Sequence, residues 1–144
     1  ATSYMFRDFG GFAGGTSAVL SNPDMSGNLS PTVARMLKFP GEVYGGSTFD
    51  LSEELVVATN SEFSMKVWSS RLVDVLLKLE GGPVGERTAV HTGTGWEQLL
   101  FDFSGISGSG TEARNRKFDN GIMDDAISGP LNWTFYFEDI DYRQ

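Results

Sequence analysis

The side chains of this chain that could do chemistry form no recognised catalytic pattern. His91 is the only histidine, there is no cysteine, and no GxSxG, HExxH, P-loop or dinucleotide fingerprint occurs. A carboxylate pair is the remaining enzymatic option, because glycoside hydrolysis uses two carboxyl groups about 5 to 9.5 Å apart. The candidates Asp124-Asp125 and Glu138-Asp139 are sequence neighbours, which an alternating strand would point to opposite faces. The sequence therefore argues against catalysis.

A second group of side chains has the chemistry of a sugar-binding surface. A pyranose ring stacks its C–H groups on an aromatic face, while its hydroxyls need donors and acceptors around the rim. Candidates for this role alternate outward on consecutive predicted strands and are expected to share one sheet face: Trp68, Lys66, Lys78, His91, Trp96 and Gln98. Tyr44, beside two glycines, is a further candidate at a loop rim. Alternatively, a loop covers Trp68 or Trp96, or the tryptophan packs under the sheet edge.

These side chains must be positioned by β-strands. Residues 62–80 contain two alternating runs, in which Phe63 to Val67 and Val73 to Leu79 each place apolar residues on one face. We predict that the two runs pair as a hairpin with one buried face, and that Trp68 lies with Lys66 and Lys78 on the other face. The hairpin would then form the centre of the site.

The rest of the chain predicts an all-β fold. Alternating runs bounded by glycine, asparagine and proline turns predict further strands at residues 4–9, 16–20, 32–39, 43–51, 86–92, 96–103, 121–123 and 132–142. No repeat and no long amphipathic helix is visible. An antiparallel β-sandwich or jelly roll is expected, with the first and last strands paired in one sheet. Residues 104–130 receive no predicted role.

Composition limits the classes of partner. The 144 residues fit one domain, 1–144, and the net charge of −8 disfavours binding to a nucleic acid backbone. No apolar run reaches the roughly 18 residues of a membrane span. Without cysteine there is no disulfide framework or thiolate metal site.

The order of the segments resembles a known group of binding modules. The motifs that carry the resemblance are FRDFGGF, SNPDMSGN, GEVYGGSTF, FSMKVWSS, VLLKLEGG, GWEQLLFDFS and WTFYFEDIDY. From Phe6 to Tyr142 they are similar to galactose-binding-like jelly rolls akin to the family 4 and family 16 carbohydrate-binding modules, found beside glycoside hydrolases of marine bacteria. Residues 114–128 depart from that pattern because they lack an apolar strand. The resemblance implies a sugar-binding module with a structural calcium ion and no catalytic activity.

By the same resemblance, Asp8 on the first strand and Asp139 on the last would hold calcium if those strands pair. Carbonyls near Gly10 or in residues 26–28 would complete the oxygen shell. Ordinary surface carboxylates are the alternative.

We therefore expect a monomeric, non-catalytic module of a larger secreted or cell-surface protein, which binds a polysaccharide and targets an attached glycoside hydrolase. Lys66 and Lys78 favour an anionic or mixed polymer. An adhesion or structural jelly roll that uses the same face as a protein interface is the alternative, and a polysaccharide-cleaving enzyme is the third possibility.

Overall fold

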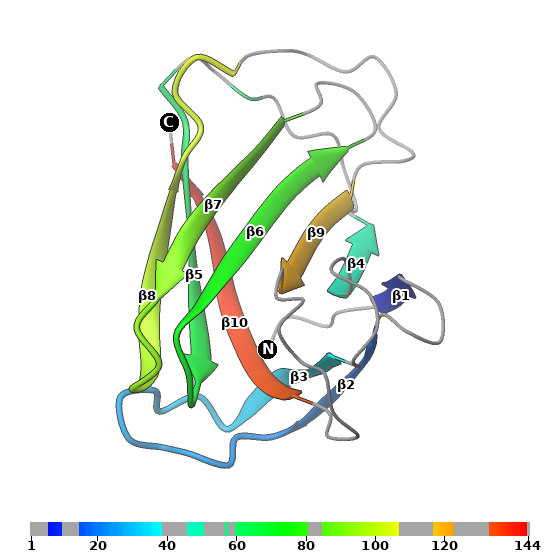
Figure 1. Ribbon diagram of the computed structural model, residues 1–144, viewed down its shortest axis with the longest axis vertical. Coiled ribbons are helices and arrows are strands. Elements are labelled where there is room, and N and C mark those ends of the chain that lie inside the picture. The colour runs from blue at the N-terminus through cyan, green and yellow to red at the C-terminus, as the bar shows by residue number, and fades with distance from the viewer. Residues whose placement is uncertain are drawn as a thin grey trace.

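The computed structural model describes residues 6–9, 15–38, 46–50, 57, 60–80, 85–106, 117–122 and 133–143. Within these ranges the chain forms ten β-strands and no helix. The strands are β1 (Phe6–Phe9), β2 (Gly15–Ser21), β3 (Thr32–Lys38), β4 (Gly46–Asp50), β5 (Glu62–Ser69), β6 (Val73–Glu80), β7 (Gly85–His91), β8 (Gly95–Asp102), β9 (Lys117–Ile122) and β10 (Trp133–Arg143) (Figure 1).

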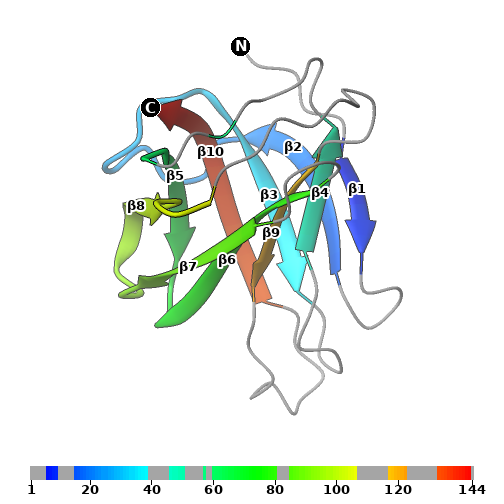
Figure 2. The same ribbon diagram turned by 90° about the horizontal axis from the view of Figure 1, so that it is seen from above.

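The strands divide into two five-stranded antiparallel sheets. One, which we call the β6 sheet, has the order β1-β4-β9-β6-β7, and the other, the β10 sheet, has the order β2-β3-β10-β5-β8. Figure 2 shows the sheets as two facing layers. The predicted all-β antiparallel sandwich is confirmed. No helix in the described ranges is long and apolar enough to cross a membrane.

Strands β5 and β6 do not form the predicted hairpin. β5 pairs with β10 and β8, whereas β6 pairs with β7 and β9. The chain crosses between sheets at residues 70–72, so both strands point their apolar residues into the core from opposite sides. Val67 and Val75 are each 1% exposed. The buried faces were predicted correctly and the pairing wrongly, because alternation looks the same whether two strands pair or face each other.

The first and last strands also lie apart. β1 pairs with β4 at one edge of the β6 sheet, while β10 lies between β3 and β5 in the centre of the β10 sheet. The predicted pairing of the chain ends is therefore wrong. A strand pattern identifies a strand but not its partner.

Apolar side chains from both sheets fill the space between them. Phe63 packs edge-on against Phe103 with ring centroids 4.7 Å apart, and burial of each large apolar side chain contributes about 1.5 to 3 kcal/mol. The buried core residues are Val33, Ala34, Met36, Val57, Phe63, Met65, Val67, Val73, Val75, Leu77, Leu79, Leu99, Phe101, Phe103, Phe135 and Phe137. The two sheets are thus held rigidly behind their outer faces.

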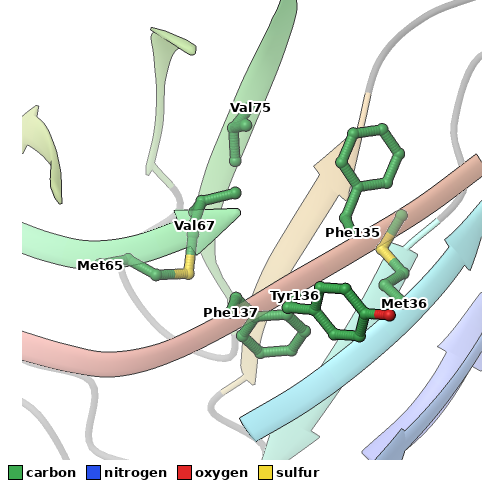
Figure 3. A pocket seen from close by; sticks show the side chains of 7 residues that line it. All are labelled: Met36, Met65, Val67, Val75, Phe135, Tyr136 and Phe137. Carbon is green, nitrogen blue, oxygen red and sulfur yellow. The ribbon is translucent and has the colours of Figure 1, made fainter. Parts of the chain in front are cut away.

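A small pocket lies among these side chains in the described part of the chain. Figure 3 shows its lining residues, which are Met36, Met65, Val67, Val75, Phe135, Tyr136 and Phe137. Its volume is about 10 Å³, close to the minimum that a single water requires. The pocket is far too small for a sugar, so a ligand of that size must bind elsewhere.

Candidate functional site

The outer face of the β10 sheet carries three aromatic side chains side by side. Trp68 on β5 is opposite Tyr136 on β10 and opposite Trp96 on β8. The rings of Trp68 and Tyr136 meet at an interplanar angle of 66° with centroids 5.3 Å apart. All three side chains are partly buried. We call Tyr136, Trp68 and Trp96 the aromatic row.

Polar side chains flank the aromatic row. Arg35 on β3 is opposite Tyr136, and the next outward positions along three neighbouring strands are Glu138, Lys66 and Gln98, which are opposite one another. The β10 register shifts just after Glu138, and Asp139 adopts a left-handed φ of 48°. This irregularity allows Asp139 Oδ2 to lie 3.1 Å from Lys66 Nζ.

The connection from β2 to β3, residues 22–31, folds on itself around Asn22. Its Nδ2 donates to the carbonyl oxygens of Asn28 and Ser30 at 2.9 and 3.0 Å, and its backbone N–H donates to Pro31 O at 2.9 Å. Side-chain oxygens of Asn22 and Asn28 accept from backbone N–H groups two residues on, as in Asx turns. The β2–β3 loop therefore has a defined shape of its own.

The same loop docks onto the aromatic row. Trp68 Nε1 donates to Asp24 Oδ2 at 3.0 Å, and Trp96 Nε1 donates to the carbonyl oxygen of Asp24 at 2.7 Å. Further along, Ser30 Oγ donates to Glu138 Oε1. A loop thus covers part of both tryptophans, which is the alternative raised by the sequence. Their indole N–H groups are committed to the loop, so they can offer only ring surface to a ligand.

Three buried polar atoms, one on this loop and two on strands β3 and β10, have no hydrogen-bond partner in the described structure: Asn28 Nδ2, Arg35 Nε and Glu138 Oε2. Asn28 is 2% exposed and Glu138 is 5% exposed. An unsatisfied buried polar atom costs about 1 to 3 kcal/mol, so each of the three calls for an explanation.

The structure brings four of the predicted ligand residues together and places Lys78 and His91 elsewhere. Trp68, Lys66, Trp96 and Gln98 share the outer face of the β10 sheet. Lys78 lies on β6 in the other sheet, because β5 and β6 do not pair. Tyr44 falls outside the described residues.

His91 does not face outward as predicted. It is 0% exposed, and its Nε2 donates to Val67 O across the sandwich at 2.9 Å. Gly93 N–H donates to Nδ1 at 2.9 Å, and Glu97 Oε2 lies 2.8 Å from the same nitrogen. The alternation of β7 places Val90 outside and His91 inside. His91 therefore links the two sheets behind the Trp68–Trp96 pair.

Glu97 on β8 accepts hydrogen bonds from the turn between β7 and β8. Its Oε2 accepts from Thr92 N at 3.0 Å and from Thr92 Oγ1 at 2.8 Å. Burial alone would raise the pKa of Glu97, but the bonds from Thr92 and the nearby His91 outweigh it and hold that pKa below its usual value. Glu97 is therefore a structural carboxylate at neutral pH.

The two residues predicted for calcium lie on strands that do not pair. Asp8 lies on β1 and Asp139 on β10, in different sheets, so the pairing on which the prediction depended is absent. Asp139 instead pairs with Lys66. Among the described residues, no group of three or more acidic, histidine or cysteine side chains is placed to hold a metal. The predicted pairing is therefore wrong, and calcium binding itself stays a prediction.

Sequence reasoning missed Tyr136, Arg35, Glu138 and Asp24 as members of the site. Tyr136 was detectable, since it alternates with the inward Phe135 and Phe137. The others depend on strand order and on the path of the β2–β3 loop, which no local pattern specifies.

Two solved structures resemble this chain in fold. MgGH51 α-L-arabinofuranosidase, solved with bound arabinose, aligns with a TM-score of 0.65 and 17% identity over 95% of this chain and 22% of the enzyme. TmCBM61, solved in complex with β-1,4-galactotriose, aligns with a TM-score of 0.54 and 12% identity over 96% of this chain and 88% of the module. No family model and no curated protein sequence matches. Such identities show a shared β-sandwich fold alone, and this chain spans less than a quarter of the enzyme's length.

Proposed function

We propose that this chain is a non-catalytic carbohydrate-binding module whose glycan lies on the outer face of the β10 sheet. The observation that carries the proposal is the aromatic row, in which three neighbouring strands present Tyr136, Trp68 and Trp96 in register. Aromatic faces are the usual platform for the C–H face of a sugar ring. The fold similarity to TmCBM61 supports the same class of function.

The aromatic row and the polar side chains beside it would contact different parts of the glycan. Asp24 accepts hydrogen bonds from both indole N–H groups. The tryptophans therefore supply stacking surface, while other side chains form hydrogen bonds with the sugar hydroxyls. Gln98 is exposed beside the row and offers both an amide donor and an acceptor. The Lys66 ammonium is paired with Asp139, so it provides less attraction for an anionic polymer than the sequence suggested.

A second candidate function is a protein interface on the same side. Leu29 is 80% exposed and Met25 is 47% exposed on the β2–β3 loop, and Leu100 on β8 is 57% exposed. Exposed apolar side chains of this kind can mark a contact surface. This interpretation predicts self-association or partner binding that Leu29→Ser weakens, with no dependence on polysaccharide.

Three wider features complete the proposal. We infer that the module works outside the cell and holds an attached glycoside hydrolase or surface protein on its substrate. Calcium binding is a separate proposal without support from the Asp8 and Asp139 positions, and a chelator that lowers the melting temperature would support it. Production of new reducing ends from a polysaccharide would contradict the non-catalytic assignment.

Affinity gel electrophoresis against soluble polysaccharides tests the function directly. The panel should include glucan, galactan, mannan, xylan, alginate and polygalacturonate. Retardation by at least one polymer is expected, with Trp68→Ala and Tyr136→Ala each weakening it by about tenfold, the effect of losing a stacked ring. Trp68→Phe keeps a ring but loses the bond to Asp24, so it should bind better than Trp68→Ala.

The matched control is Thr88→Ala on β7, which is exposed on the other sheet and should behave as wild type. Thermal unfolding of each variant separates loss of binding from loss of structure. Absence of retardation by every polymer, or equal retardation of wild type, Trp68→Ala and Tyr136→Ala, would refute the proposed function.

A further inference from the structure

Three residues on the β2–β3 loop, β3 and β10 each carry an unpartnered buried polar atom. Ser30 connects two of these residues, since its N–H donates to Asn28 Oδ1 at 3.1 Å and its Oγ donates to Glu138 Oε1. The third residue is Arg35 on β3. It is opposite Tyr136 on β10, and Tyr136 lies two positions before Glu138. Diagonal neighbours in a sheet are within reach of long side chains. We call Asn28, Arg35 and Glu138 the polar trio.

The polar trio has a specific hydrogen-bonding pattern. Asn28 Nδ2 and Arg35 Nε are donors, whereas Glu138 Oε2 is an acceptor. A hydroxyl group has two lone pairs and one proton, so it can accept from both nitrogens and donate to the carboxylate. We propose that the polar trio reads one hydroxyl of the glycan, and that this hydroxyl belongs to the hydroxymethyl group of a neutral hexose polymer. This inference rests on the proposed function.

Other ligand groups match the polar trio less well. A sugar carboxylate has no proton to donate and would bring a second negative charge beside Glu138. A metal cation would meet the guanidinium of Arg35 and the amide nitrogen of Asn28, neither of which is a metal ligand. The adjacent Lys66 and Asp139 charges offset each other, and the whole chain carries a net charge of −8. The charges therefore favour a neutral polymer over the anionic one expected from Lys66 and Lys78.

The burial of the polar trio limits which hydroxyl can reach it. Because Asn28 and Glu138 are almost fully covered, a hydroxyl attached directly to a ring would require the whole ring to enter. A hydroxymethyl group projects from the ring by one carbon and can enter while the ring stays on Tyr136. Entry needs a small shift of the β2–β3 loop, whose direct bond to Glu138 comes from Ser30.

The test compares one polymer before and after oxidation of its hydroxymethyl groups to carboxylates. The probe is whichever of glucan, β-1,4-galactan and mannan retards the wild type most, together with its C6-oxidised form. Wild type should bind the neutral form at least about tenfold more tightly, the expected effect of a lost bond to a charged group. Glu138→Gln should reduce this preference to about threefold or less, since it removes the negative charge. Arg35→Gln should weaken binding of the neutral form.

Glu86→Gln is the matched control, because it removes one negative charge from an exposed position on β7 in the other sheet and should leave the preference unchanged. Equal binding of the oxidised polymer by wild type would overturn the inference, as would strongest binding to xylan, whose pentoses lack the hydroxymethyl group. An unchanged preference in Glu138→Gln, even with a lower melting temperature, would assign the polar trio a structural role only. In these cases Trp68-dependent binding still supports the proposed function, whereas loss of all binding refutes both.

Discussion

Replacement of Asp24 by alanine should weaken the attachment of the β2–β3 loop to the aromatic row. Asp24 Oδ2 accepts from Trp68 Nε1 at 3.0 Å, and Oδ1 accepts from Ser26 N at 2.9 Å. A bond to a charged acceptor contributes about 1.5 to 3 kcal/mol and an exposed turn bond about 0.5 kcal/mol. The free energy of unfolding should therefore fall by about 2 to 3.5 kcal/mol, while the backbone acceptor for Trp96 is retained.

Urea denaturation followed by tryptophan fluorescence measures this change. The slope with denaturant should stay constant, so that the shift in midpoint reports stability. Asp74→Ala is the matched control, because Asp74 is exposed on β6 and surface changes of this kind stay within about 0.5 kcal/mol. Asp24→Asn retains one acceptor and should give an intermediate loss. If Asp24→Ala unfolds like Asp74→Ala, the loop is not held by these bonds.

The other predictions concern the framework behind the site. Gly93→Ala should lower the free energy of unfolding by at least about 2 kcal/mol more than Gly105→Ala. Both glycines have positive φ, but a Cβ at Gly93 would lie 2.3 Å from the carbonyl carbon of Arg71, whereas nothing lies within 4 Å of a Cβ at Gly105. Equal melting temperatures of the two variants would contradict this contact. Glu97→Gln should destabilise the protein fully at pH values above the unfolded-state pKa of Glu97, about 4.3. The destabilisation should shrink as pH falls through the folded-state pKa of Glu97, which is lower. A loss that is the same in urea titrations at pH 6 and pH 3 would disprove the ionic role. Phe101 is 1% exposed, so Phe101→Ala should lower the free energy of unfolding by about 3 to 5 kcal/mol. A calorimetric loss below about 1 kcal/mol would show that the core collapses into the space left by the ring.

The aromatic row shows how far sequence reasoning reached. Alternation in β5 and β8 placed Trp68 and Trp96 outside, and both are on the same outer face. The sequence could not show that Tyr136 joins them, because that depends on β10 lying next to β5. Nor could it show that Asp24, 44 positions before Trp68, closes over the pair.

Lys78 and His91 show where the same reasoning failed, for different reasons. Lys78 was placed with Lys66 on the assumption that neighbouring strands in sequence pair, but the chain changes sheets between them. For His91, alternation with Val90 left open which of the two faces outward, and the prediction chose the wrong one. The burial of His91 is stable because Nε2 donates to Val67 O and Nδ1 accepts from Gly93 N–H, and the Val67 acceptor lies 24 positions away on the opposite sheet.

The sequence by itself determined the all-β class, the approximate positions of most strands, and the buried face of strands such as β5 and β6, whereas only the end of β9 was predicted. These properties follow from local patterns, because side chains alternate along a strand and glycine-rich turns end it. Only the tertiary structure decided which strands pair, which residues share the outer face, and which polar atoms are left to bind a ligand. Those properties depend on strand order and loop path, and they bring together residues separated by up to about a hundred positions, such as Ser30 and Glu138.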